Sequence, residues 1–155
     1  MVILGIDPGT TRIGYGLIKK SAGELECLGY GIIGHFDKDR SEQIRKVSES
    51  ISGLIKKYRP EVSGIEKIFF FKNQKTIISV SEMRGVILSS LALNNVALKE
   101  FTPLEIKQAV SGYGRAEKDQ VQQMVKIILK LKETIRPDDA ADALATAICC
   151  ANTLR

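Results

Sequence analysis

Four carboxylates stand where the surrounding sequence is otherwise suited to burial. Asp7 ends the apolar run MVILGID, and Glu66 lies within VSGIEKI, a second short apolar run. Asp139 and Asp142 belong to an alanine-rich segment with helical spacing, and side chains three residues apart share one helix face. An unpaired carboxylate is costly to bury and normally becomes neutral there. These acids are therefore the first candidates for chemistry.

The types of these side chains point to a metal site. Four carboxylates without histidine or cysteine make an all-oxygen ligand set, which suits the hard cations Mg²⁺ and Mn²⁺. Two such ions, about 3.5–4 Å apart, would clamp the attacking and leaving oxygens of a phosphodiester displacement. The pattern thus favours metal-assisted cleavage of a phosphodiester bond.

Each acid also has an ordinary structural explanation. An aspartate before Pro-Gly, as at Asp7, is often only a turn former, and Glu66 beside Lys67 could form an ion pair on an edge strand. Asp139 and Asp142 could be first-turn acids that the helix dipole favours. Their joint occurrence, in this order along the chain, favours one shared site over four separate explanations.

Composition bounds the class of protein. The chain has 155 residues, a net charge of +5 and 44% hydrophobic residues, which predicts a single domain over residues 1–155 and excludes intrinsic disorder. No apolar run approaches the roughly 20 residues of a membrane helix, and the start MVILGIDPGTTR lacks the features of a signal peptide. A pI of about 9.1 favours a polyanionic partner only weakly.

The three cysteines form an odd and sparse set. Cys149 and Cys150 are adjacent, Cys27 is far from them in the chain, and no metal-ligand spacing is present. Reduced, buried thiols and a cytoplasmic location are expected.

Hydrophobic periodicity predicts the elements that must position the acids. Strands are expected over Met1–Asp7, Arg12–Lys19, Glu24–Gly34, Val62–Ile68 and Val96–Phe101. Helices are expected over Ser41–Tyr58, over 74–94, from the capping box Thr102–Glu105 onward, and over 117–131 and 138–152. The element order assigned to these patterns is β-β-β-α-β-α-β-α-α.

This order predicts an α/β fold with a mixed five-stranded sheet. A three-stranded antiparallel meander would be followed by α/β crossovers, with helices on both faces. If the first and fourth strands are neighbours, Asp7 and Glu66 can project from one side of the sheet, and the last helix can bring Asp139 and Asp142 over them. The side chains expected on the opposite side are Val2, Leu4 and Ile6.

Four motifs together resemble the RuvC family of Holliday-junction resolvases. They are ILGIDPGTTRIGYG, IEKIFF, KQAVSGYGRAEKDQV and DAADALA, in this order and at these separations, and the likeness extends over essentially the whole chain. The resemblance implies a ribonuclease H-like fold, a homodimer that needs Mg²⁺ or Mn²⁺, and cleavage of four-way DNA junctions by paired symmetric nicks in recombination and repair. It also implies work beside the RuvA and RuvB branch-migration complex.

The resemblance assigns the acidic set to Asp7, Glu66, Asp139 and Asp142. One choice stays open, because Asp138 is an extra acid that would also face Asp142 at i, i+4. The family's D-x-x-D spacing selects Asp139.

Other motif matches imply catalytic lysines and DNA contacts. Lys107 and Lys118 match the family's two lysines and would offset repulsion between the acids and a phosphate. Phe69 matches the aromatic residue after the strand acid, and an exposed ring there can stack on an unpaired base. Further candidates for contacts with the DNA backbone are Lys72, Lys75 and Arg115. Residues 77–93 fit an interior helix, but the resemblance favours a dimer face whose small residues allow close approach.

Two other functions compete with a junction nuclease. GIDPGTTRIG also resembles the first phosphate loop of the actin, Hsp70 and sugar-kinase superfamily, but ATP binding would leave Glu66 and the D-x-x-D helix unexplained. A non-catalytic junction-binding module would not need all four acids.

Overall fold

The structure is a computed structural model that describes residues 1–34, 39–67 and 74–154. Its strands are β1 (Val2–Asp7), β2 (Ile13–Ser21), β3 (Glu24–Ile33), β4 (Val62–Glu66) and β5 (Ala97–Phe101). Its helices are α1 (Arg40–Tyr58), α2 (Gln74–Leu93), α3 (Pro103–Ser111), α4 (Lys118–Ile128) and α5 (Asp138–Asn152).

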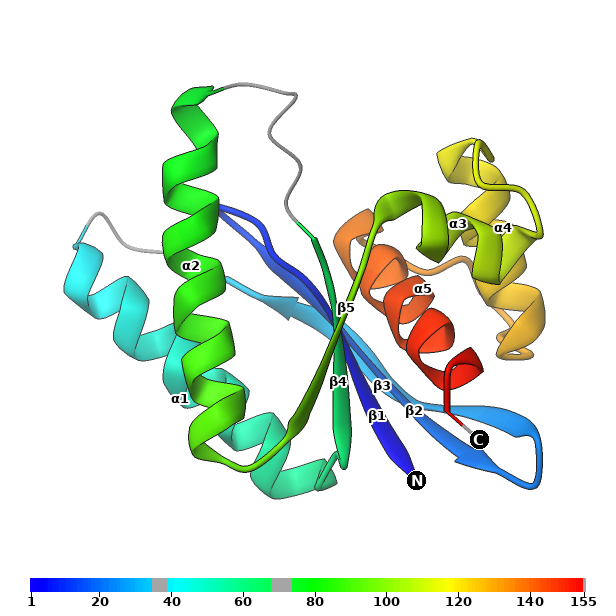
Figure 1. The fold of residues 1–155 in the computed structure, drawn as a ribbon, viewed down its shortest axis with the longest axis horizontal. Coiled ribbons are helices and arrows are strands. Elements are labelled where there is room, and N and C mark those ends of the chain that lie inside the picture. Colours follow the sequence, from blue (N-terminus) through cyan, green and yellow to red (C-terminus); the bar gives the residue numbers. More distant parts are fainter. Residues whose placement is uncertain (35–38, 68–73, 155) are drawn as a thin grey trace.

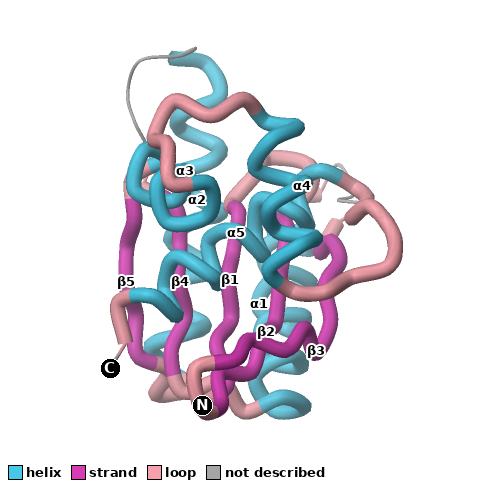
Figure 2. Tube along the Cα trace, turned by 90° about the vertical axis from the view of Figure 1, so that its right-hand side faces the viewer, coloured by secondary structure: helices cyan, strands magenta, loops and turns pink. Residues whose placement is uncertain are grey.

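The five strands form one mixed sheet in the order β3-β2-β1-β4-β5. The first three strands pair antiparallel as a meander, whereas β4 pairs parallel with both β1 and β5 (Figure 2). The predicted α/β class and mixed sheet are confirmed. The predicted element order is wrong in one place, because three helices rather than two follow β5. The helix that this order leaves out is α3, whose start the capping box Thr102–Glu105 predicts and which ends at Gly112 in a left-handed conformation with φ of 73°.

Helices cover both faces of the sheet (Figure 1). On one face α1 and α2 pack side by side, and on the other α5 lies against the sheet with α3 and α4 outside it. The side chains of β1 alternate between the two faces, as expected for a strand. Leu4 and Ile6 join the core beneath α1 and α2, whereas Ile3 joins the core beneath α5. Asp7, two residues after Gly5, therefore belongs to the face that α5 covers.

Glycines on the α5 face bring that helix unusually close to the sheet. A Cβ atom added to Gly5 would lie 2.0 Å from the carbonyl oxygen of Ala143, and one added to Gly14 would lie 1.9 Å from that of Asp139. Added Cβ atoms at Gly16 and Gly64 would also meet α5, at 2.8 and 3.0 Å. Because α5 itself is rich in alanine, backbone packs nearly against backbone, and the helix has little freedom to slide or rotate.

Two lysines hold the other end of α5. The Nζ of Lys20 on β2 donates to the carbonyl oxygen of Ala151 at 2.9 Å and also to that of Leu154. The Nζ of Lys99 on β5 donates to the Oγ1 of Thr153 at 3.0 Å. Cations at a helix C-terminus satisfy its free carbonyl groups and interact favourably with the helix dipole. These contacts attach the C-terminal end of α5 to β2 and to β5, which lie on opposite sides of the central strand β1.

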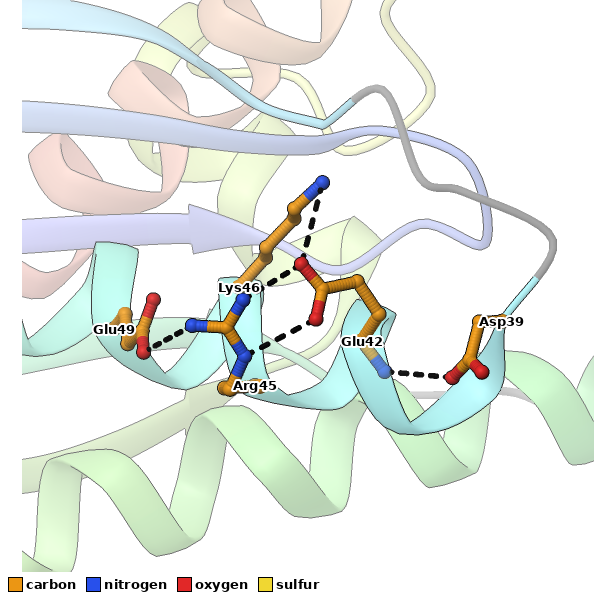
Figure 3. A network of polar contacts seen from close by, with 5 residues as sticks. All are labelled: Asp39, Glu42, Arg45, Lys46 and Glu49. Atoms are coloured by element: carbon orange, nitrogen blue, oxygen red, sulfur yellow. Dashed lines mark hydrogen bonds and ion pairs between the residues drawn. The ribbon is translucent and has the colours of Figure 1, made fainter.

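Helix α1 is stabilised by local polar contacts on its outer surface (Figure 3). Asp39 caps the helix by accepting a 2.9 Å hydrogen bond from the backbone N–H of Glu42. The guanidinium of Arg45 pairs with Glu42 at 2.6 Å and with Glu49 at 2.7 Å, and Lys46 lies 3.6 Å from Glu42. Exposed pairs at this spacing contribute little to the stability of a helix, because solvent screens them. None of the described helices has the length and apolar character needed to cross a membrane.

All three cysteines are free thiols. Cys149 and Cys150 are buried on α5, and burial, more than any other factor, raises their pKa to about 12 and about 11. Cys27 on β3 is only half-buried, so the expectation of burial is correct for two cysteines of the three.

The glycine-lined contact predicts a position-dependent response to alanine. We expect Gly5→Ala to lower the free energy of unfolding by about 2–3 kcal/mol or more, because the new methyl group overlaps the backbone of α5. Gly53 is the matched control, since an added Cβ in this α1 position meets no atom within 4 Å. Gly53→Ala should instead stabilise the protein by about 0.5–1 kcal/mol. Urea unfolding measures both, and equal effects would contradict the close packing.

The thiols should differ in reactivity. A disulfide reagent at pH 8 is expected to modify Cys27 in the folded protein and to modify Cys149 and Cys150 only after unfolding, because the thiolate is the reactive form and access is required. Counting modified thiols over time with and without urea checks this. Cys27→Ser should abolish the reaction of the folded protein, and rapid modification of that variant would contradict the burial of the pair.

Candidate active site

Two of the four candidate acids lie together at the ends of neighbouring parallel strands. Asp7 ends β1 and Glu66 ends β4, and the register pairs Ile6 with Ile65 immediately before them. The first and fourth strands are therefore neighbours, which is the condition on which Asp7 and Glu66 can share one side of the sheet. Carboxyl ends of adjacent parallel strands in an α/β sheet are a common position for binding sites.

The first turns of α5 bring the other two acids to the same place. Burial raises the pKa of Asp7 to about 7, and the negative charges of Asp142, Glu66 and Asp139 add to the shift in that order. Burial also raises the pKa of Glu66, with a further contribution from the charge of Asp142. The charges of β1, β4 and α5 therefore act on one another across a partly buried space.

Three basic side chains, those of Lys118, Arg12 and Arg136, pair with the acids of α5. The Nζ of Lys118, at the start of α4, lies 3.1 Å from Asp142 Oδ2 and 3.5 Å from Asp138 Oδ2. Burial acts to lower the pKa of Lys118, but the contacts with Asp142 and Asp138 outweigh it and raise that pKa. The Nε of Arg12 lies 3.5 Å from Asp139 Oδ2.

A pocket of about 230 Å³ opens beside these acids. Its polar wall consists of Glu66, Asp142, Lys107 and Lys118. The positive charge of Lys107 opposes the rise in the pKa of Glu66, so this lysine lies close enough to affect the carboxylate. The remaining wall is apolar and is formed by Pro103, Ile106, Val121 and Ala145. Facing acids and lysines suit a phosphate group that arrives together with cations.

The donor set fits hard divalent cations. Among the described residues, no three His, Cys, Asp or Glu side chains lie close enough together to hold a metal ion. Two of the four acids, Asp139 and Asp142, are instead engaged by Arg12 and Lys118. Burial, followed by the charges of Asp142, Glu66 and Asp139, raises the pKa of Asp7, and a divalent cation there would favour its ionised form.

The structure brings together six of the residues expected from the sequence. They are Asp7, Glu66, Lys107, Lys118, Asp139 and Asp142. Arg115 is exposed on the segment between α3 and α4. Phe69 and Lys72 lie outside the described residues, and Lys75 lies in α2 with its side chain outside them.

Sequence reasoning missed Arg12. Arg12 lies within the motif GIDPGTTRIGYG, and its place in that motif was the only sign in the sequence of a functional role. Its pairing with Asp139 joins the two ends of the chain and has no local pattern.

Comparison with known proteins identifies close relatives over the full chain. Residues 3–150 match the family described as crossover junction endodeoxyribonuclease RuvC. The protein of that name from Petrotoga mobilis is 50% identical over 156 residues, with 100% of this chain and 96% of that protein covered. The one from Syntrophomonas wolfei is 46% identical, with 100% and 91% covered. The structure of Thermus thermophilus RuvC in complex with a Holliday junction substrate superposes with a TM-score of 0.91 at 32% identity, covering 97% of this chain and 93% of that one.

The electrostatics of the site predict different effects on stability when the charge of Asp7 or that of Asp138 is removed. The raised pKa of Asp7 means that ionised Asp7 destabilises the fold increasingly as the pH rises from about 4 to about 7. Without divalent ions, Asp7→Asn should therefore raise the free energy of unfolding at pH 8, on the order of 1–3 kcal/mol, and much less at pH 4.

Asp138→Asn is the control for this prediction. A hydrogen bond from Gln122, then the charge of Lys118, lower the pKa of Asp138, so its ionised form is favoured in the fold. Removing that charge should not stabilise the protein at pH 8. Urea unfolding in EDTA at both pH values measures the free energy of unfolding of the two variants. Stabilisation by both substitutions or by neither would contradict the conclusion that ionised Asp7 destabilises the fold.

Proposed function

The chain belongs to the RuvC family of crossover junction endodeoxyribonucleases, and we infer that it resolves four-way DNA junctions by paired, symmetric nicks in recombination and DNA repair. The family's activity is hydrolysis of DNA phosphodiester bonds with divalent metal ions. The single observation that carries this function to the present chain is the convergence of four acids from β1, β4 and α5 beside Lys107 and Lys118.

Asp7, Glu66, Asp139 and Asp142 are proposed to hold two Mg²⁺ ions, with Mn²⁺ as a substitute. When bound, the ions would supply charge for the developing phosphorane and an activated water. Asp7 comes from the central strand and is affected by all three other acids, which supports a role as the shared ligand.

Lys107 and Lys118 are proposed to act on the phosphate that is cut. Both line the pocket that also contains Glu66 and Asp142, from α3 and α4 respectively. Each ammonium group can donate to a nonbridging phosphate oxygen and reduce its repulsion from the acids. The ion pair of Lys118 with Asp142 holds this lysine at the site before DNA arrives.

Asp139 is favoured over Asp138 as the fourth ligand. The charge of Asp139 is one of the largest contributions to the raised pKa of Asp7, and the charge of Asp138 is not. Asp138 faces Gln122, Lys118 and Arg136 instead. A supporting role in holding Lys118 suits this position.

DNA contacts beyond the cleaved phosphate are proposed for Phe69, Lys72, Lys75 and Arg115. Phe69 would stack on a base that has lost its partner at the junction, which contributes about 1–3 kcal/mol per stacked base. Arg115 is exposed next to the pocket-lining helices, where a phosphate can reach it. Contacts of this kind make affinity fall steeply with salt.

The outer side of α2 is the proposed dimer face. Met83, Ile87 and Leu91 are buried against the body of the protein, so only one side of this helix is interior. The opposite side exposes small residues and two large apolar ones, namely Gly85, Ser89, Ala92, Ile78 (67% exposed) and Leu93 (81% exposed). A two-fold dimer would present two sites to the two equivalent strands of a junction.

We further propose how the protein is organised and where it acts. Residues 1–155 act as a single nuclease domain in the cytoplasm, beside the RuvA and RuvB branch-migration complex. The ATP-binding alternative is not favoured, because it assigns no role to Glu66 or to the acids of α5, and a non-catalytic role is not favoured because all four acids converge.

Removal of one carboxylate should separate cleavage from binding. Asp7→Asn keeps the side-chain shape but removes a charge that the metal ions need, so nicking of a synthetic four-way junction in Mg²⁺ should fall by about 10²-fold or more. Binding of the same junction in Ca²⁺ or EDTA should persist, because it depends on basic residues. Gel electrophoresis measures both on one substrate.

Asp138→Asn serves as the matched control and should retain most of the nicking activity. Glu66→Gln, Asp139→Asn and Asp142→Asn should resemble Asp7→Asn. Near-normal nicking by folded Asp7→Asn would disprove the two-ion site, and joint loss of binding and cleavage would make Asp7 a DNA-positioning residue.

A further inference from the structure

A second hollow adjoins the pocket and shares Lys118 with it. It is lined by three basic residues, Arg12, Lys118 and Arg136, and by Pro137, Asp138 and Asp139. Every one of its cations is paired with an acid of α5. The acids, however, are less exposed than the arginines: the side chain of Asp139 is 30% exposed, against 52% for Arg12. The basic groups are therefore the more exposed part of this hollow.

Arg12 is held in a fixed position relative to Asp7. It ends the turn between β1 and β2, and this turn is so tight that a Cβ atom on Gly9 would lie 2.1 Å from the carbonyl oxygen of Arg12. An added Cβ on Gly34 would also lie 3.2 Å from the Cα of Arg12. The backbone that carries the guanidinium is therefore packed from two sides, and only the side chain is free to change partner.

The ion pair between Arg12 and Asp139 can be replaced by a contact of Arg12 with another anion. It is made through Nε at 3.5 Å, and no other partner of the guanidinium is present among the described residues. Its two terminal nitrogens can thus receive a phosphate in the forked geometry that arginine provides. An exposed ion pair of this length stabilises the protein only slightly, so a better partner can replace it.

We propose that Arg12 exchanges partners when DNA binds: in the free protein it neutralises Asp139, and on the junction it turns to a backbone phosphate next to the cleaved bond and leaves Asp139 free to coordinate metal. This inference rests on the proposed function, because it takes Asp139 to be a metal ligand and DNA to be the substrate. Arg12 is thus a positioning residue whose pairing disfavours metal binding until a strand lies in the second hollow.

The exchange predicts two effects of opposite sign in Arg12→Gln. Without DNA, the variant should bind Mn²⁺ about two- to five-fold more tightly, because the competitor for Asp139 is gone. Without metal, it should bind a four-way junction several-fold more weakly, and the slope of log affinity against log salt should shrink by about 0.9. Titration calorimetry with Mn²⁺ and gel shifts in EDTA at several salt concentrations give the two values. A purely structural role would not raise the affinity for the metal.

Arg136→Gln is the matched control. It removes a cation from the same hollow, but the partner of Arg136 is Asp138 at 3.4 Å, so the affinity for Mn²⁺ should stay near that of the unaltered protein. Arg12→Lys keeps the positive charge, so its affinity for Mn²⁺ should be close to that of the unaltered protein. Its affinity for the junction should lie between those of Arg12→Gln and the unaltered protein. Arg45→Gln on α1, whose partners are Glu42 and Glu49, should change neither value.

The outcomes separate this inference from the proposed function. Unchanged Mn²⁺ affinity in Arg12→Gln, an equal rise in Arg136→Gln, or unchanged junction affinity in Arg12→Gln would each overturn the exchange. If Arg12→Gln does not fold, the Arg12→Lys comparison decides, since loss of the fork with retention of charge must still weaken junction binding. Failure of the unaltered protein to nick a junction in any divalent cation would disprove the proposed function instead, and neither affinity measurement depends on cleavage.

Discussion

The close approach of α5 to the sheet is the contact on which the rest of the structure depends. Gly5 and Gly14 leave no room for a side chain, and the carbonyl oxygens of Ala143 and Asp139 occupy the space that a methyl group would need. Such backbone-to-backbone packing fixes both the height and the rotation of a helix. Asp139 is itself one of the residues in contact, so the packing of α5 against the sheet also fixes the position of its acids.

That placement has an electrostatic consequence. A helix held this close brings two carboxylates over two others that already end β1 and β4, and burial reduces the solvent that would screen them. The pKa of Asp7 rises to about 7 because of burial and its acidic neighbours. Lys118 and Arg12 offset part of this repulsion by pairing with Asp142 and Asp139. The site is therefore a balance of opposite charges in a partly buried space.

Local patterns predicted the elements well where one periodicity extends over a whole segment. The apolar run that ends at Asp7 and the alternating side chains of β1 lie as expected, with Leu4 and Ile6 in the core opposite to the acid. The sequence leaves open whether β1 and β4 are neighbours, and the register shows that they are. The element order omitted one helix after β5, where a capping box starts α3 and Gly112 ends it after nine residues. So short a helix shows little periodicity beyond its start signal.

The chemistry of the candidate site and the local spacing of its parts follow from the amino-acid sequence. Four acids with all-oxygen chemistry, the D-x-x-D face of a helix and the lysines of two short motifs are properties of residue type and of 3.6-residue periodicity. Which of these charges meet depends on the tertiary structure. Arg12 pairs with Asp139, and Lys20 caps the distant end of α5, because strand register and the rotation of α5 bring opposite ends of the chain together. No local pattern encodes that rotation, since it results from how closely a glycine-lined sheet lets the helix approach.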